Sequence, residues 1–272
     1  ELGAVSIVPN GSFEAGSYQT FVLTYVAGKF GIDDSGSMRV CFRFASDQTR
    51  PQFEDPKGPN YTTIEASNNA VLTYHYDPKG NVRPWDRTLY IKVVRGFLRE
   101  GDKITITFGD RSGGSPGMRL QTFCEDSYEF HTLIDPIATY CYQPMPVQPV
   151  IKIIPGKPDR YLAVAPTIRA IDESFSIKFK GEDKWGNPSD QCDIQLYPHA
   201  SHPIKNLPNM VSLKPGEFFG VIEGLLVADA ADLHIDFLDD AGVVRCRTNP
   251  IRIEPAPLSR HFWGDLHGQS EE

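Results

Sequence analysis

Lys103-Ile104-Thr105-Ile106-Thr107-Phe108 alternates apolar and polar residues with a period of two. In an extended strand this alternation sends the apolar side chains to one face and the polar side chains to the other, as a half-buried strand requires. The same pattern recurs in residues 39–44 (R-V-C-F-R-F) and 176–180 (S-I-K-F-K), and β-branched and aromatic residues are frequent in these stretches. The sequence therefore predicts an all-β protein built from antiparallel β-sandwiches.

Turn signals and a proline-rich stretch predict how the strands are grouped into domains. Residues 142–149 (Y-Q-P-M-P-V-Q-P) contain too many prolines for a central strand and are typical of an extended linker. We therefore expect an N-terminal β-sandwich over residues 1–145. A second sandwich follows over residues 150–256, with its first strand at Ile151 and with the size and strand spacing of an immunoglobulin-like domain. Residues 258–272 form a third segment.

A turn within the second domain has a simple physical interpretation. Residues 183–188 read D-K-W-G-N-P, which resembles a D-x-x-G-N-P turn of bacterial immunoglobulin-like modules. Asp183 and Asn187 are expected to bond nearby backbone amides, Gly186 to adopt positive φ, and Pro188 to restart an extended chain.

Composition excludes several classes of function. The chain of 272 residues has a formal net charge of −8, so its surface is expected to repel nucleic-acid phosphates. No apolar run is long enough to span a membrane. The five cysteines are odd in number and widely spaced, which predicts mostly buried thiols and favours a cytoplasmic, reducing location.

The chemical motif lies at the C-terminal end of the sequence. Residues 263–270 read W-G-D-L-H-G-Q-S, which resembles the opening strand of the PHP superfamily, named for its polymerase and histidinol phosphatase members. The motif, together with residues 109–117 (G-D-R-S-G-G-S-P-G) and other stretches, is similar to an uncharacterised bacterial branch of these proteins. The resemblance implies a metal-dependent hydrolase that acts on an ester or phosphoester.

The resemblance also implies roles for three residues of the motif. His267 is the candidate first ligand of a divalent metal (Zn, Mn or Fe), and Asp265 lies on the same strand face as a candidate partner that orients it. Gln269 stands where the superfamily usually has a second histidine, so it is expected to contact a metal-bound water instead. A catalytic metal needs about three protein ligands. We therefore expect the first strand of an α/β barrel whose remainder is missing, and neither a bound metal nor catalysis in this chain.

Three further residues are candidates for the rim of that active site. Arg111 lies in the glycine-rich loop, Arg83 precedes Pro84 and Trp85, and Glu125 ends the stretch 121–125. Arg83 could lie over the Trp85 indole near a ligand. Each of the three also has a structural interpretation: a long turn for Arg111, a structural corner for Arg83, and an edge or interdomain hydrogen bond for Glu125. Among the histidines, His75 alternates with tyrosines and suits a cross-strand position, whereas His199 and His202 suit a solvated loop.

Two functions of different class remain open from the sequence. In the first, the two sandwiches form a non-catalytic scaffold, and their partner is the protein's own C-terminal metallohydrolase domain. In the second, they form a carbohydrate- or surface-binding module, because the chain has 11 tyrosines and 3 tryptophans that exposed patches could use.

Overall fold

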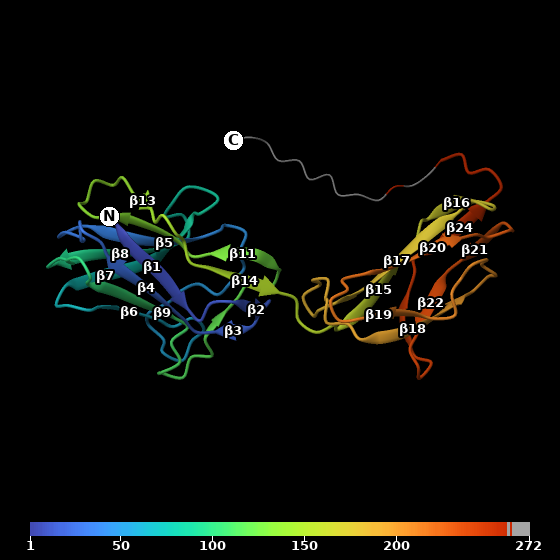
Figure 1. Cartoon of the computed structure of the whole chain (residues 1–272), viewed down its shortest axis with the longest axis horizontal. Coiled ribbons are helices and arrows are strands. Elements are labelled where there is room, and N and C mark those ends of the chain that lie inside the picture. The colour runs from blue at the N-terminus through green and yellow to red at the C-terminus, as the bar shows by residue number, and fades with distance from the viewer. Residues whose placement is uncertain (260–261, 263–272) are drawn as a thin grey trace. The chain divides into compact units, whose positions relative to one another are not determined.

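In the computed structural model, residues 1–259 and residue 262 are described, and this part of the chain consists of strands and loops without a helix (Figure 1). The all-β prediction is therefore confirmed. No helix of membrane-spanning length and hydrophobicity occurs in these residues. The chain divides into two compact units, and the boundary in the sequence lies between Ile154 and Pro155.

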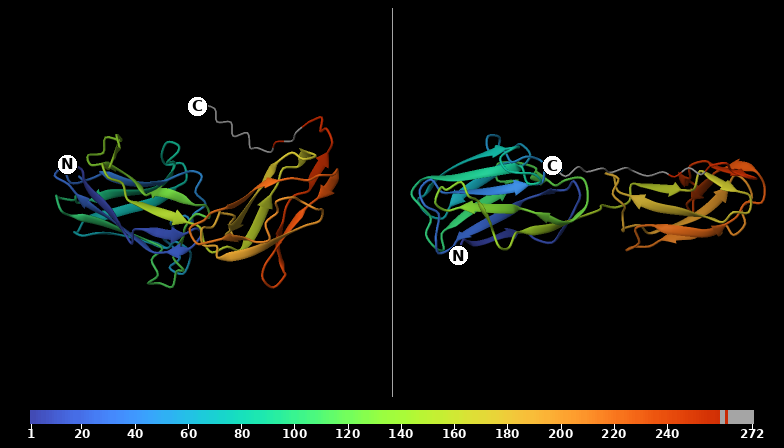
Figure 2. Two further views of the ribbon diagram at one scale, coloured as in Figure 1. Left: turned by 45° about the vertical axis from the view of Figure 1, so that its right-hand side comes forward. Right: turned by 90° about the horizontal axis from the view of Figure 1, so that it is seen from above.

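Unit 1 contains two main sheets and two smaller ones (Figure 2). Their orders are β1-β4-β9-β6, β13-β12-β5-β8-β7, β11-β14-β2 and β10-β3. The strands are β1 (Gly3–Val8), β2 (Ser12–Glu14), β3 (Tyr18–Gln19), β4 (Phe21–Ala27), β5 (Ser37–Phe42), β6 (Thr62–Ala66), β7 (Val71–Asp77), β8 (Arg87–Arg95), β9 (Lys103–Phe108), β10 (Met118–Arg119), β11 (Glu125–Glu129), β12 (His131–Asp135), β13 (Gln143–Pro144) and β14 (Val150–Ile154).

The two main sheets of unit 1 face each other across a core rich in aromatic rings. Phe130 lies at the centre, with ring centroids 5.6 Å from Phe21, 5.6 Å from Phe42 and 5.8 Å from Phe108. All four side chains are buried. The alternation in β9 holds as predicted, because Ile104, Ile106 and Phe108 are all in this core. In β5 the alternation ends at Phe42, and Phe44 lies beyond the strand and is exposed.

Unit 2 is a second sandwich with its own core. Its sheets have the orders β15-β17-β20, β16-β24-β21 and β19-β18-β22-β23. Phe179 and Phe237 stack across the core with centroids 5.6 Å apart. The strands are β15 (Arg160–Val164), β16 (Ile168–Ala170), β17 (Phe175–Glu182), β18 (Ile194–Ala200), β19 (Val211–Leu213), β20 (Gly220–Leu225), β21 (Ala231–Leu233), β22 (Ile235–Leu238), β23 (Val244–Arg247) and β24 (Ile251–Glu254).

Most strand pairs are antiparallel, as expected, but each unit also contains a parallel pair. In unit 1, β14 pairs in parallel with β2, and in unit 2, β16 pairs in parallel with β24. In both cases a strand near the start of the unit joins one at its end. The long chain between the two strands makes a parallel pairing feasible, which a hairpin cannot do.

The chain forms two units, but the expected linker at residues 142–149 and the start of the second domain at residue 150 differ from the structure, in which unit 1 ends at Ile154. Ile151 and Ile153 are buried in the core of unit 1, and β14 pairs with β11 and β2 of the same unit. The proline-rich stretch before it is also attached. The side chain of Gln148 accepts a hydrogen bond from the Thr132 amide at 2.8 Å and donates to the Thr132 carbonyl at 3.0 Å. A glutamine amide thus replaces the backbone bonds that prolines cannot make.

The turn at 183–188 has the predicted role for Asp183 and the predicted positive φ at Gly186, and the Asn187 side chain donates to the Asp183 carboxylate at 2.9 Å. The Asp183 carboxylate, 1% exposed, accepts hydrogen bonds from the backbone amides of Trp185 and Asn187 at 2.9 Å and of Gly156 at 3.1 Å. Gly186 has φ of 93°. The bond to Gly156 ties this turn to the first residues of unit 2. Burial raises the pKa of Asp183, but these hydrogen bonds and one from the Asn187 side chain outweigh it, and the net shift is downward.

We predict that Phe130→Ala lowers the free energy of unfolding of unit 1 by about 3–5 kcal/mol, the usual cost of removing a buried aromatic ring. Urea denaturation measures this change. Phe44→Ala is the matched control: its ring is exposed, so a change within about 0.5 kcal/mol is expected. Equal losses in the two variants would contradict the central position of Phe130.

We predict that Asp183→Ala destabilises unit 2 by at least about 2 kcal/mol, because it leaves three backbone amides, one buried and two part-buried, without this acceptor. Hydrogen exchange of the amides at 156 and 185–187 should accelerate in the variant. Asp240→Ala removes an exposed carboxylate of the same unit and should leave both measurements near wild type. Unchanged exchange in Asp183→Ala would show that the carboxylate does not hold the turn.

The lowered pKa of Asp183 also predicts a pH dependence. The unfolded group titrates near the ordinary value of 3.8, and the folded group titrates lower. The stabilisation is therefore complete above about pH 4 and is lost as the pH falls through the folded pKa. The difference in unfolding free energy between wild type and Asp183→Asn should be smaller at pH 3 than at pH 6. An equal difference at both pH values would refute the assignment.

Candidate binding pocket

The predicted metal residues Asp265, His267 and Gln269 lie outside the described residues, so the metal site stays a prediction. Within residues 1–259 and 262, no group of three or more histidine, cysteine or acidic side chains is arranged to hold a metal ion. The prediction that His199 and His202 lie in one loop was also wrong. His199 belongs to strand β18, and only His202 lies in the loop that follows.

Arg111 has a structural partner in its own domain. Its Nη2 atom donates to the carbonyl of Tyr18 at 2.9 Å, which fastens the glycine-rich loop to β3. Asp110 at the start of the loop accepts hydrogen bonds from the Ser112 amide and the Thr63 hydroxyl, both at 2.9 Å. The Ser112 amide is the main cause of the lowered pKa of Asp110. These contacts are those of a long, well-anchored turn.

Arg83 and Glu125 both contact the segment that follows β5. The Arg83 guanidinium lies 5.0 Å from the centroid of the Phe44 ring, and Glu125 pairs with Arg43 at 3.4 Å. The expectation that Arg83 covers an indole was wrong, because Trp85 instead stacks on the His131 ring with centroids 4.7 Å apart. No described contact joins Arg111 to either residue. The three predicted rim residues therefore do not form one cluster.

The outer face of the sheet β13-β12-β5-β8-β7 carries a row of residues of a different kind. Arg39 on β5 is opposite Tyr90 on β8, and Tyr90 is opposite His75 on β7. The rings of His75 and Tyr90 have centroids 5.1 Å apart, which confirms the cross-strand position expected for His75. Met38 and Val40, the neighbours of Arg39, point the other way into the core.

A loop at residues 136–142 brings two more tyrosines to this face. Asp135 holds the loop by accepting hydrogen bonds from the Thr139 amide at 3.0 Å and the Tyr140 amide at 2.6 Å. Burial raises the pKa of Asp135, but these bonds outweigh it and leave the pKa lowered. At the end of the loop, the hydroxyl groups of Tyr142 and Ser37 are 2.6 Å apart. The tyrosines are thus presented by a loop that is fixed to the sheet.

The row and the loop enclose a small pocket, which we call the tyrosine–arginine pocket. Its volume is about 170 Å³. Aromatic, hydroxyl and charged groups converge in it, and Tyr140 is 78% exposed at its edge. The lining residues are Arg39, His75, Asp77, Gly80, Thr88, Tyr90, Tyr140 and Tyr142.

Arg39 is the central charge of the pocket. Its guanidinium carbon lies 3.7 Å from the centroid of the Tyr142 ring and 5.8 Å from that of Tyr90, so aromatic faces hold it by cation–π contacts. Its Nη1 atom donates a long hydrogen bond of 3.4 Å to the Asn81 side chain. Its Nε atom is buried without a hydrogen-bond partner, and Arg39 forms no ion pair with any residue that the structure describes.

Tyr142 adds a neutral hydroxyl group to the pocket, and Asp77 adds a carboxylate. Burial raises the pKa of Tyr142, so the phenol is neutral at physiological pH and can donate or accept a hydrogen bond. Asp77 accepts a hydrogen bond from the Lys79 amide at 2.8 Å, which closes the adjacent turn. The pocket therefore combines one cation, one carboxylate, neutral hydroxyls and aromatic rings, which is the chemistry of a binding site for a small polar ligand.

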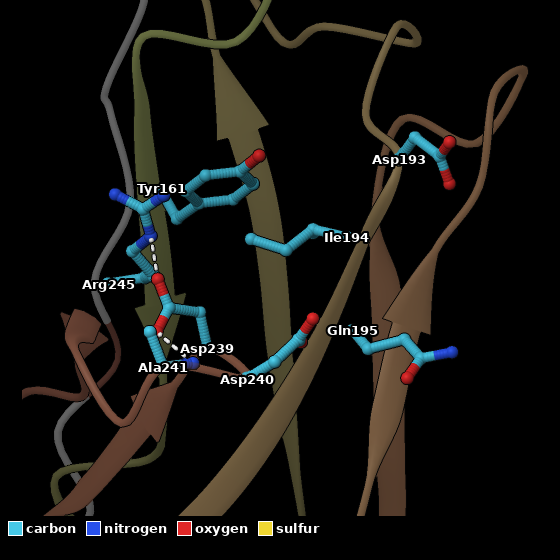
Figure 3. Close-up of a pocket in the computed structure, with 8 residues that line it drawn as sticks. All are labelled: Tyr161, Asp193, Ile194, Gln195, Asp239, Asp240, Ala241 and Arg245. Carbon is cyan, nitrogen blue, oxygen red and sulfur yellow. Dashed lines mark hydrogen bonds and ion pairs between the residues drawn. The ribbon is translucent and has the colours of Figure 1, made fainter.

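A second, more open hollow of about 510 Å³ lies in unit 2 (Figure 3). Asp239 is its best-held side chain: Arg245 Nε lies 2.9 Å from one carboxylate oxygen, and the Ala241 amide donates to the other at 3.0 Å. Asp193 and Asp240 are exposed, and Figure 3 shows them on separate segments with different directions. Tyr161 is the only aromatic residue in the part of the lining that the structure describes, so this hollow lacks the convergent aromatic groups of the tyrosine–arginine pocket.

Sequence reasoning missed Arg39, Tyr90, Tyr140 and Tyr142. One sequence feature could have indicated that Arg39 faces away from the core: it belongs to an alternating stretch and lies on the face opposite Val40. The two loop tyrosines were assigned to the end of a domain and to a linker. Their approach to Arg39 depends on the fold of the 136–142 loop, which the local sequence pattern does not reveal.

Comparison with known proteins identifies no family. No protein-family model matches this chain, and no curated protein matches it. Among solved structures it is similar to the adhesin InvE of Yersinia pseudotuberculosis, with 8% identity, a TM-score of 0.27 and coverage of 92% of this chain and 58% of that chain. For InvD of the same organism the values are 13%, 0.37, 98% and 60%.

Red sea bream transglutaminase is also similar, with 11% identity, a TM-score of 0.23 and coverage of 93% of this chain and 31% of that chain. The chain spans less than two thirds of each of these proteins. At such TM-scores the similarity does not indicate what this chain does.

Proposed function

We propose that this chain is a carbohydrate-binding β-sandwich module and that the tyrosine–arginine pocket holds the sugar. The observation that carries the proposal is the convergence of Tyr90, Tyr140 and Tyr142 with polar groups on the outer face of one sheet. Sugar rings present both C–H bonds, which pack on aromatic faces, and hydroxyls, which need hydrogen-bond partners. Tyrosine offers both kinds of contact.

The size of the pocket favours a small ligand. Pockets for drug-sized molecules have volumes of roughly 300–1,000 Å³, whereas this pocket has about 170 Å³. It therefore suits a single sugar ring, or the end residue of a longer glycan whose remainder stays in solvent. The exposed ring of Tyr140 at the edge is placed to contact the next residue of such a chain.

The pocket is also largely formed without a ligand. Arg39, His75 and Tyr90 are on hydrogen-bonded strands, and the loop that carries Tyr140 and Tyr142 is attached through Asp135 and Ser37. Groups that are already in place lose little conformational entropy on binding, which favours affinity for a small ligand.

A second candidate function is a scaffold for a PHP-like metallohydrolase. The observation that favours it is the motif W-G-D-L-H-G-Q-S at residues 263–270, with His267 as the proposed metal ligand. Comparing a longer natural chain with its catalytic domain alone would test this role. A catalytic domain that is soluble and fully active by itself would exclude a need for the scaffold.

We predict that the protein binds glycans on a printed array and that Tyr140→Ala lowers the affinity at least about tenfold. The mechanism is the loss of ring stacking, and the side chain is exposed, so the fold should be unaffected. Isothermal titration with a glycan found on the array measures the affinity, and thermal unfolding monitors the fold.

Tyr197→Ala is the matched control for this experiment. Tyr197 is 38% exposed on β18 of unit 2, outside the pocket. Its removal should leave glycan affinity unchanged. An array without any bound glycan, or equal losses in the two variants, would refute sugar binding at this pocket.

A further inference from the structure

We infer that the sugar held by the tyrosine–arginine pocket carries a carboxylate, as uronic acids do. This inference rests on the proposed sugar-binding function and names its ligand class. It follows from the position of Arg39, whose positive charge has no acidic partner among residues 1–259 and 262.

The guanidinium has unused hydrogen-bonding capacity. Arginine has five N–H donors in a planar fork, and within the described residues Arg39 makes one long hydrogen bond, to Asn81. The Nε donor is buried and unpaired. Because this Nε lies out of contact with solvent, a ligand would bind the two Nη groups, and a carboxylate that accepts two parallel bonds suits such a pair of donors.

The stacking of Arg39 orients the fork. Tyr142 covers one side of the guanidinium at 3.7 Å, with Tyr90 also nearby at 5.8 Å. Rings above a guanidinium leave its edge, where the N–H groups point, as the side that can contact a ligand. The edge therefore suits a planar anion, and the exposed side chain of Tyr140 is left to contact the rest of the sugar.

Asp77 decides where in the pocket the negative group binds. Among residues 1–259 and 262 it is the only carboxylate that lines the pocket, and it would repel an anion placed next to it. The ligand's carboxylate therefore belongs at Arg39, and the ligand's hydroxyls, which can donate hydrogen bonds, belong at Asp77. This division gives the pocket a polarity that matches a ring with an acid at one position and hydroxyls at the others.

The charge balance favours a carboxylate over a phosphate. Of the described residues, Arg39 is the only lysine or arginine in the lining, Asp77 is present, and the whole chain has a net charge of −8. A phosphate monoester has a charge of about −1.5 to −2 at neutral pH, so it would need a second cation. One guanidinium suffices for one carboxylate.

The test compares acidic sugars with their neutral counterparts on the full chain. Isothermal titration or NMR titration would use D-glucuronate against D-glucose and D-galacturonate against D-galactose. At least one acid should bind about tenfold or more tightly than its neutral counterpart, because a charge-assisted pair adds to the shared ring contacts. Arg39→Gln should abolish this preference and bind both sugars of the pair equally.

Lys92→Gln is the matched control, because Lys92 is on β8 of the same sheet and does not line the pocket. It removes the same charge and should keep the preference for the acid. If Lys92→Gln also lost the preference for the acid, the general electrostatic field, and not contact with Arg39, would select the ligand. This result would overturn the inference.

The outcomes separate the inference from the proposed function. If neutral sugars bind as tightly as acids, or if glucose-6-phosphate binds more tightly than glucuronate, the carboxylate class is overturned while sugar binding stands. If no sugar of any class binds, both fail. Should Arg39→Gln fail to fold in thermal unfolding, the comparison of acid with neutral sugar on the wild-type protein still decides the question.

Discussion

The alternation of side chains along β5 is the constraint on which unit 1 and its pocket both depend. Met38, Val40 and Phe42 enter the core, where Phe42 packs on Phe130. Because successive residues of a strand point to opposite faces, burial of these three commits Arg39 to the outer face. The position of the arginine is thus a consequence of core packing, and a shift of the strand by one residue would exchange the two sets.

Carboxylates that accept several hydrogen bonds have a common task in this protein. Asp135 fixes the loop that carries Tyr140, and Asp183 fixes the turn that ties the first residues of unit 2 to β17. Asp110 fixes the glycine-rich loop in the same way. In each case hydrogen-bond donors surround the ionised oxygen, and the pKa is lowered rather than raised. A carboxylate of this kind acts as a hydrogen-bond acceptor for loops and is unsuited to general acid chemistry at neutral pH.

The contrast between Arg39 and the arginines chosen from the sequence shows what makes a binding residue recognisable. Arg111 bonds a backbone carbonyl, and Arg83 is exposed beside Phe44 and Asp86. Both come from conspicuous motifs, whereas Arg39 comes from an ordinary alternating strand. What distinguishes Arg39 is its unpaired donor beneath aromatic rings, and this property depends on contacts between β5, β8 and the loop before β13. The prediction of the linker failed for a similar reason, because the Gln148 side chain completes a strand bond that proline cannot.

Local sequence determined the strands, the turn at Asp183 and the all-β class, because alternation, positive-φ glycine and side-chain capping act over a few residues. It also placed His75 opposite another strand. Tertiary structure alone decided that residues 150–154 close unit 1, that Trp85 stacks on His131 and that three tyrosines meet Arg39. These features join segments up to about 140 residues apart in the chain, as in the pairing of Ser12 with Lys152. Such contacts follow from the pairing and register of strands, which hydrophobic periodicity within one segment does not specify.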